Sequence, residues 1–282
     1  MSTRTRLIIL CLLICIGLSA CLESEVPALY VNPDILPVED RSGCLVTSPP
    51  ADLGLDNFYR KYCSAQGIPI VASSEVDDLA LQQAYYLINN ILAPIPEIRN
   101  RLVEDGHYIA IIGKDQEQTT LPEYAHMDSS YWDARARGLG GGNNNPVTSC
   151  GEENLLCLGR GSDRYFGENI LIHEFSHTIH LGGQGSSYSE FNNQLSHLYY
   201  QAREKGLWEN TYAMTNREEY WAEGVQSYFN SNQSRPLPDG VHNKIDTREE
   251  LADYDPDLYK FIAGFFDYFA WEPSCPDKKA LQ

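Results

Sequence analysis

The chain has 282 residues, a formal net charge of −18 at pH 7 and eight cysteines. Its length suffices for one large domain, or for one domain with an N-terminal extension. Because nucleic acids and anionic lipid surfaces select basic proteins, such strong acidity argues against both as partners.

Residues 1–20 have the pattern of an export signal. Arg4 and Arg6 precede an apolar run over residues 7–17, which is too short to span a membrane comfortably as a mature helix. The Leu-Ser-Ala-Cys stretch that ends at Cys21 resembles the lipobox of bacterial lipoproteins, in which Cys21 becomes the lipidated first residue; an ordinary secretory signal is the alternative. Both readings predict export, either as a cell-surface or outer-membrane lipoprotein if the source is bacterial, or as a secreted protein.

Two parts follow the signal. Residues 21–50 belong to a stretch rich in Pro, Glu, Asp and Ser and are expected to form a tether, and residues 51–282 are expected to form one domain. Loss of the two signal arginines takes the net charge from −18 to −20, so contact with a membrane is expected only through the possible lipid anchor.

An exported protein meets an oxidising compartment, so disulfides are expected. We predict a bond between Cys150 and Cys157, which enclose a short loop, and a second bond between Cys44 and Cys63. This pairing leaves Cys275 single, unless the lipobox cysteine escapes lipidation and becomes its partner. The cysteines do not have the Cys-x-x-Cys spacing of a zinc site.

Apolar periodicity predicts an α+β fold that is mainly helical, with a small sheet before the helix that contains residues 173–177. The clearest strand covers residues 107–113, and residues 114–166 lack clear periodicity. The Gly- and Asn-rich stretch 135–146 is either a wall of a substrate cleft or a solvated surface loop; its two arginines, at 135 and 137, either meet acidic substrate groups or pair with the excess carboxylates. The other predicted elements are a strand at 68–71 and helices at 75–92 (capped by Ser73 or Ser74), 98–103, 167–181, 190–205, 211–229 (capped by Thr215 or Asn216) and 256–270.

The segment His173-Glu174-Phe175-Ser176-His177 lies in an apolar, helix-compatible run. At 3.6 residues per turn, His173 and His177 share one helix face and can bind one zinc ion, and Glu174 can reach a water bound to that ion. Zinc lowers the pKa of the water, and the carboxylate can take its proton as the water attacks a carbonyl. The alternative is a buried helix with incidental histidines. A further histidine, His180, either points towards the site or lies outside it.

Catalytic zinc takes a third protein ligand and keeps one position for water. A metzincin would have its third histidine six residues after His177, where this chain has Gly183. Glu219 and Glu223 are four residues apart and share one face of the predicted helix 211–229. One of them can bind the ion while the other orients a ligand imidazole from behind.

Together the two segments resemble the protease domain of anthrax lethal factor and its smaller relatives, the secreted Pro-Pro endopeptidases. That family carries a helical HEFGH and then Tyr-x-x-Thr-Asn-x-x-Glu-aromatic-aromatic-Ala-Glu, and this chain has HEFSH at 173–177 and a matching segment at 212–223. By this resemblance Glu219 is the third zinc ligand, Tyr212 hydrogen-bonds the developing oxyanion, and Glu223 is the acid behind the ligands.

The chain also departs from that family, and the resemblance covers about a third of it. Ser176 replaces the usual glycine. Trp221-Ala222-Glu223-Gly224 faintly matches the Trp-x-x-Glu-Gly type segment of aminopeptidase-like zincins, in which Glu223 would be the ligand. Glu219 is favoured because the matches at Tyr212 and at the Thr-Asn pair come with it.

The resemblance implies that residues 51–282 form a zincin-like catalytic domain. It implies an exported zinc-dependent endopeptidase that holds one Zn²⁺ and acts on a protein or peptide, and we expect a monomer. The rival is a surface binding protein that keeps the zinc as a structural clamp, which the intact Glu174 argues against because such a clamp has no use for a base. Hydrolysis of a non-peptide amide is a third reading. The preferred cleavage site does not follow from these residues.

Overall fold

The computed structural model of the protein describes residues 29–276, so the predicted signal and Cys21 lie outside the described residues. The fold is α+β, as predicted. One mixed sheet of five strands has the order β1-β2-β3-β5-β4. The strands are β1 (Lys61–Ala65), β2 (Ile68–Ala72), β3 (Tyr108–Ile112), β4 (Gly138–Leu139) and β5 (Val147–Gly151).

The central strand is β3, whose apolar residues are buried on both faces of the sheet. Such a continuous apolar run is typical of a strand covered on both sides. It pairs in parallel with β2 and β5. Both edges of the sheet are antiparallel: β1 pairs with β2, and the two-residue strand β4 pairs with β5. The edge formed by β4 is the one that lies next to the metal-site helix described below.

The described residues contain nine α-helices, and six of them are at predicted positions. The first begins at Asp78 because Asp77 caps it by accepting a hydrogen bond from the Leu79 amide, so the predicted caps Ser73 and Ser74 are wrong. The helices are α1 (Asp78–Leu92), α2 (Pro96–Glu104), α3 (Ser129–Arg135), α4 (Glu152–Leu155), α5 (Ile170–Leu181), α6 (Tyr188–Glu204), α7 (Arg217–Tyr228), α8 (Arg248–Tyr254) and α9 (Pro256–Phe265).

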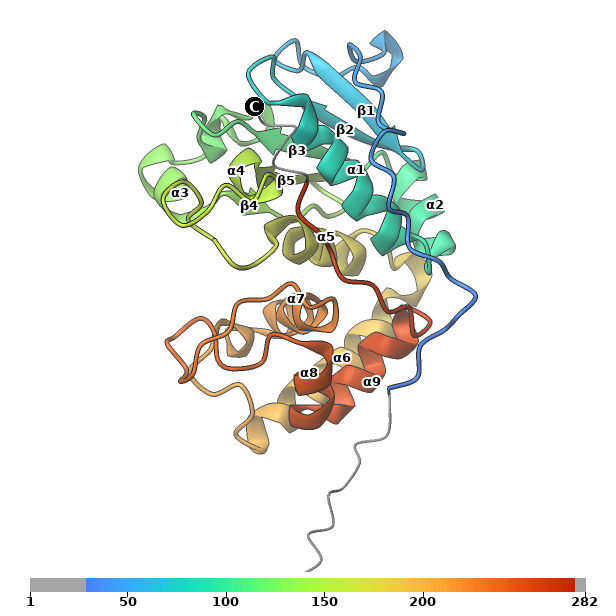
Figure 1. The fold of residues 1–282 in the computed structure, drawn as a ribbon, viewed down its shortest axis with the longest axis vertical. Coiled ribbons are helices and arrows are strands. Elements are labelled where there is room, and N and C mark those ends of the chain that lie inside the picture. Colours follow the sequence, from blue (N-terminus) through green and yellow to red (C-terminus); the bar gives the residue numbers. More distant parts are fainter. Residues whose placement is uncertain (1–28, 277–282) are drawn as a thin grey trace, which may run out of the picture.

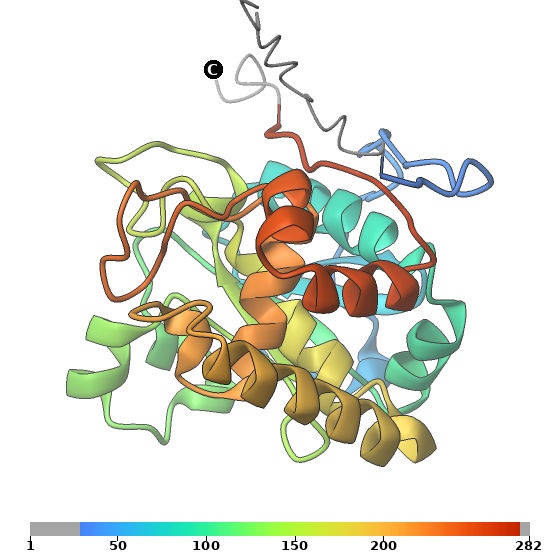
Figure 2. The same ribbon diagram turned by 90° about the horizontal axis from the view of Figure 1, so that it is seen from below.

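Helix α5 lies between two halves of the molecule. The sheet with α1 to α4 forms one half, and α6 to α9 form the other (Figure 1). Figure 2, seen from below, shows α6, α8 and α9 in front of α5 and α7. An aromatic core joins this half together: the buried indole of Trp221 on α7 contacts Phe191 on α6 and Phe265 on α9. This packing fixes α7 against α5, which is the contact that forms the site.

Both terminal segments cross from one half to the other. Residues 29–50, part of the segment expected as a tether, run along the surface past α9 and α1 (Figure 1). The amide and the carbonyl of Val38 bond to the side chain of Asn90 on α1, both at 2.8 Å. At the other end of the chain, the carbonyl of Ser274 accepts hydrogen bonds from Arg41 and Gln83. The two termini therefore brace the α1 side of the molecule.

Residues 29–276 contain two disulfides. The predicted bond between Cys44 and Cys63 is present, with 5.4 Å between the Cα atoms. The predicted bond between Cys150 and Cys157 is wrong, because Cys157 is bonded to Cys275. The residues between Cys150 and Cys157 form the short helix α4 and not a loop. Cys150 is therefore buried on β5, whereas Cys157 is half-buried beyond the helix, where the C-terminal segment passes.

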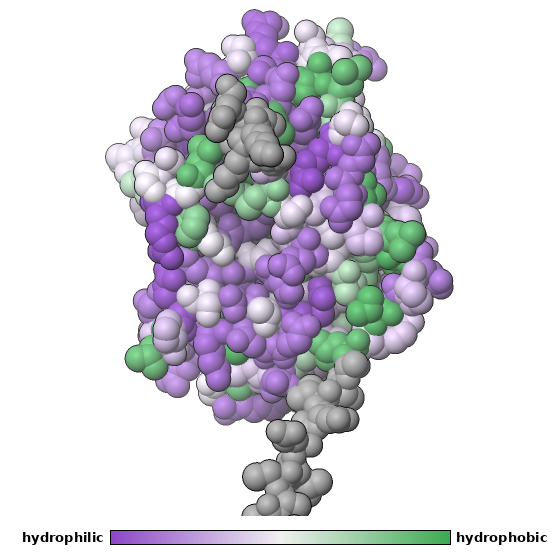
Figure 3. Space-filling model, viewed as in Figure 1, coloured by the Kyte–Doolittle hydropathy of each residue, from purple (hydrophilic) through white to green (hydrophobic). Residues whose placement is uncertain are grey.

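The two disulfides fit an extracellular protein. Over residues 29–276, the structure contains no helix with the length and apolarity needed to cross a membrane. The face seen in Figure 3 is mainly hydrophilic, with separate hydrophobic spots in place of one continuous apolar area.

Candidate metal centre

Helix α5 presents its two histidines as the sequence predicts. Asn169 caps the helix by accepting a hydrogen bond from the Ile172 amide, and the helix ends at Leu181, as predicted. His173 is buried and His177 is half-buried, and both point towards α7. The four-residue spacing brings their rings edge to face, with centroids 5.0 Å apart.

Helix α7 supplies the third member of the cluster. Asn216 is its N-cap, and the capping side chain accepts a hydrogen bond from the backbone amide of Glu219 at 2.8 Å. The cap thus fixes the backbone of the residue whose carboxylate faces the two imidazoles. His173, His177 and Glu219 form the cluster in which three ligand atoms lie within 4.8 Å of one another.

The cluster has the spacing of a tetrahedral metal site. Glu219 Oε2 lies 3.1 Å from His173 Nε2 and 3.2 Å from His177 Nε2, and the two imidazole nitrogens are 3.3 Å apart. Two ligands bound at 2.0–2.1 Å to a tetrahedral ion are about 3.3 Å apart. The three atoms can therefore hold one metal ion with little rearrangement, and the triad resembles an HExxH…Glu zinc site.

The charges around the triad favour a cation. Burial lowers the pKa of His173, but its hydrogen bond to Glu219 and the charges of Glu174 and Glu223 outweigh that effect and raise the pKa to about 10. Burial raises the pKa of Glu219, and its hydrogen bonds with both histidines outweigh this and hold that pKa well below the usual range. A positive charge is thus strongly stabilised between these side chains.

Two residues of α7 lie behind His173. Gln226 Oε1 is 2.8 Å from Nδ1 of that imidazole, and Glu223 Oε1 is 3.6 Å from the same atom. Gln226 is fully buried and donates to the backbone carbonyl of Asn169 at the start of α5. The acceptor at hydrogen-bonding distance is therefore Gln226, which the sequence reasoning missed. Its only signal was its place on the same helix face, seven residues after Glu219.

Glu223 is held away from the ligand position. Its carboxylate accepts a hydrogen bond from Asn232 at 3.0 Å, and its burial raises its pKa. The carboxylate of the cluster is that of Glu219, so the alternative in which Glu223 is the metal ligand does not fit.

Glu174 faces the cleft beside the two imidazoles. Burial raises the pKa of its carboxyl group, while the charges of His173 and His177 and the Gly140 amide lower it. The segment that follows β4 lies directly on this part of α5. A Cβ atom added to Gly140 would be 2.5 Å from His177 Cβ and 2.8 Å from the backbone oxygen of Glu174. Glycine is required there by this close approach.

Tyr212 lies in the loop before α7 and reaches the triad. Its hydroxyl donates to Glu219 Oε1 at 3.1 Å and accepts from Arg135 Nη2 at 3.3 Å. The ring centroid is 6.3 Å from that of His173. The structure therefore brings together the triad, Glu174 and Tyr212, five residues taken from two helices and one loop.

The triad opens into a cleft with a volume of about 580 Å³. Its walls come from both halves of the molecule, and the Gly-rich stretch 135–146, which we expected to be either a cleft wall or a solvated loop, contributes residues 135–140. His180 points away and packs between Tyr188 and Phe191. The lining residues include Trp132, Arg135, Arg137, Leu139, Tyr165, Glu168, Glu174, Leu181, Tyr212, Glu218 and Val241 beside the triad.

A scan against protein-family models, a search of curated proteins and a search of solved structures each find no match to this chain. The likeness to a zinc site therefore stands on the geometry of the triad and on the two sequence segments that carry it.

Proposed function

We propose that the protein is an exported zinc-dependent endopeptidase. The observation that carries the proposal is the convergence of His173, His177 and Glu219 in a cleft that also contains Glu174 and Tyr212. A site with three protein ligands that opens into a cleft keeps a position for water, whereas structural zinc sites are closed by four ligands.

Zinc fits this donor set better than magnesium or calcium does. Two imidazole nitrogens and one carboxylate oxygen in tetrahedral spacing are typical of catalytic zinc, and magnesium and calcium prefer oxygen ligands. Zinc bound there would supply a Lewis acid that brings the pKa of a bound water towards neutrality.

The protein side chains then perform the proton transfers. Glu174 takes the proton of the attacking water and passes it to the leaving amine. A base is most effective when its pKa lies near the working pH, and burial shifts the pKa of Glu174 in that direction. The hydroxyl of Tyr212 donates to the oxygen on which charge develops, and a donor of this kind lowers the barrier by about 3–4 kcal/mol.

We place the substrate chain along β4. This strand is an edge of the sheet, and residues 138–140 line the cleft beside the triad. An extended peptide can pair with the backbone of an edge strand, which gives affinity without fixing the side chains of the substrate. This placement supports a peptide substrate over a small amide, and we propose that the enzyme acts as a monomer.

The alternative is an exported binding protein with a structural metal. The open cleft and the buried carboxylate of Glu174 beside the triad support catalysis instead, because a clamp requires neither.

The test uses residues 22–282 of the wild type and of Glu174→Gln, with Glu190→Gln on the exposed face of α6 as a control that removes the same charge. Bound zinc and cleavage of a diverse peptide library are measured for each. Zinc near one equivalent in all three, with cleavage lost only in Glu174→Gln, is the expected result. Zinc without cleavage by the wild type would favour the binding protein, and absence of zinc from all three would overturn the site.

A further inference from the structure

We infer that Arg135 is a specificity-determining residue that binds a carboxylate of the substrate close to the scissile bond. This inference rests on the proposed peptidase function and assigns a substrate class to the same cleft. Arg135 is the last residue of α3 and lines the cleft opposite α7. Its Nη2 atom is 3.3 Å from the hydroxyl of Tyr212, which is itself 3.1 Å from a carboxylate oxygen of Glu219.

The charge of Arg135 is not neutralised by an ion pair. Within residues 29–276, the ion pairs of the structure do not include this guanidinium. The other arginine of the cleft, Arg137, is buried and makes a two-pronged bond to Glu153 at 2.6 and 2.7 Å. Arg135 is therefore the cleft cation that is left to meet a ligand.

Three carboxylates that line the cleft already have basic partners. Glu218 bonds to Arg217 at 3.0 Å, and Glu168 is 3.4 Å from the ring of His242. Glu219 bonds to the two metal-site histidines. A guanidinium without an ion pair beside the reaction centre is suited to bind a negative group of the substrate at that point.

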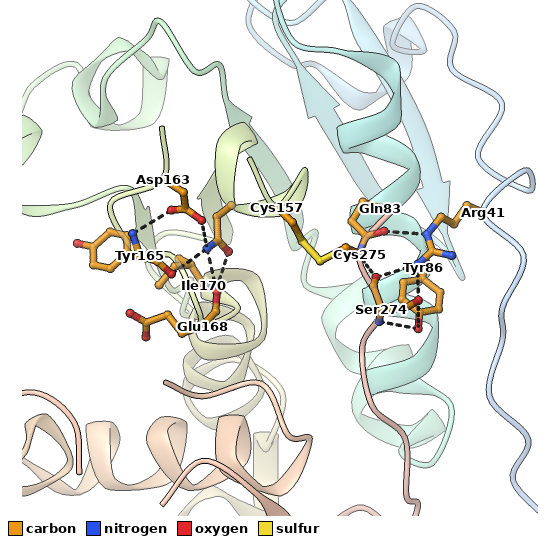
Figure 4. The surroundings of a disulfide bond; sticks show 11 residues. Arg41, Gln83, Tyr86, Cys157, Asp163, Tyr165, Glu168, Ile170, Ser274 and Cys275 are labelled. Atoms are coloured by element: carbon orange, nitrogen blue, oxygen red, sulfur yellow. Dashed lines mark hydrogen bonds between the residues drawn. A yellow bond between two sulfur atoms is a disulfide. The ribbon is translucent and has the colours of Figure 1, made fainter. Parts of the chain in front are cut away.

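Hydrogen bonds fix the backbone of Arg135 in the wall of the cleft. The hydroxyl of Tyr165 donates to the Arg135 carbonyl at 2.8 Å, and Arg164 donates to the Ala134 carbonyl at 2.9 Å. The amide of Tyr165 donates to Asp163 (Figure 4). The same carboxylate accepts from Asn154. Anchoring of this kind lowers the entropy lost when the side chain binds a ligand.

The chemistry of guanidinium points to a carboxylate. Arg presents five N–H donors in a plane, and two of them can bind a carboxylate in a bidentate hydrogen bond. One donor of Arg135 bonds to Tyr212, so the others are free to bind. Because Tyr212 is placed to contact the scissile carbonyl, the carboxylate belongs within a residue or two of that bond. It can come from an Asp or Glu side chain or from a free C-terminus.

The test compares matched peptides with the wild type, Arg135→Gln and Arg135→Glu. A cleaved library peptide is made with Glu, Gln or Lys at each position within two residues of the cut, and with a free or an amidated C-terminus. The control is Arg60→Gln, which removes the same charge from an exposed residue beside the opposite edge strand β1. Zinc content and the urea midpoint are measured for each variant, to confirm the fold.

We expect the wild type to cleave the Glu peptide at least tenfold better, in kcat/KM, than its Gln counterpart at one of these positions. Arg135→Gln should bring this ratio to about one, Arg135→Glu should favour Lys, and Arg60→Gln should keep the ratio. If amidation of the C-terminus lowers kcat/KM instead, the carboxylate that Arg135 binds is the terminal one. A wild type that does not distinguish the charged from the neutral peptides, or an equal loss on all peptides in Arg135→Gln, overturns the inference.

The inference and the proposed function fail separately. If the wild type cleaves no peptide, the peptidase proposal fails, and binding then tests Arg135. Fluorescence anisotropy is measured with Glu174→Gln and with Glu174→Gln/Arg135→Gln, on labelled library peptides made with Glu, Gln or Lys at matched positions. Weaker binding of the Glu peptide alone to the double variant supports the carboxylate site, and equal binding to both proteins rejects it.

Discussion

Substitution of Gly140 by alanine tests the contact between β4 and the metal-site helix. The new methyl group would lie 2.5 Å from His177 Cβ and 2.8 Å from the backbone oxygen of Glu174, whereas ordinary contacts begin at 3.4 Å. The segment and α5 must therefore separate by about 0.9 Å. Overpacking of this kind costs about 1–3 kcal/mol. A shift of about 1 Å at a reaction centre also lowers the rate about 100-fold.

Gly264→Ala is the matched control, because Gly264 is exposed on α9 and a Cβ atom there would meet nothing within 4 Å. This substitution should leave stability unchanged or raise it by up to about 1 kcal/mol, since alanine favours helices. Urea unfolding gives the stability of both variants, and kcat/KM on one cleaved peptide gives the activity. If Gly140→Ala matched the wild type in both measurements, the close approach of β4 to α5 would be refuted.

Four other predictions follow from the site and the disulfides. Gln226→Leu removes the acceptor behind His173 and should weaken zinc binding about 10–100-fold in competition with a chromophoric chelator; an unchanged affinity would mean that Glu223 alone orients the ring. Tyr212→Phe should lower kcat by about 100–1000-fold with zinc retained, and loss of zinc would make the phenol structural. Replacing Cys157 and Cys275 by alanine, which opens a loop of 118 residues, should cost about 5 kcal/mol, against about 3 kcal/mol for the 19-residue loop closed by Cys44 and Cys63; the reverse order in urea unfolding contradicts this. Burial raises the pKa of Cys150, so its thiol should resist iodoacetamide at pH 8 until the protein unfolds, and rapid labelling of the native protein would contradict its buried position.

The metal-site helices could be predicted because their signals are local. The i, i+4 spacing of His173 and His177 follows from helix geometry alone, and Asn216 caps the second helix where the sequence places a capping residue. The position of Glu219 opposite the histidines could be predicted only through the resemblance, since nothing in its own helix distinguishes it from Glu223. The structure separates them, because Asn232 binds the carboxylate of Glu223.

The rest of the sheet could not be predicted from periodicity. Strand β4 has only two residues, and β5 (Val-Thr-Ser-Cys-Gly) carries polar side chains although all five residues are buried. Its burial arises from tertiary packing between β3, β4 and α5, which the periodicity of its own residues does not record. The disulfide of Cys157 depends in the same way on where the C-terminal segment passes, which no spacing of cysteines records.

The Gly-rich stretch shows how composition and tertiary contact are linked. Its glycines suggest a mobile loop when they are considered alone, since glycine favours turns. In the structure Gly138 and Gly140 lie against Ile170 and His177 of α5, and a side chain at either position would collide with the helix. The absence of side chains therefore brings a sheet edge to the metal centre. The same segment begins at Arg135, so the strand that can hold a peptide backbone and the cation that we propose to select its charge enter the cleft together.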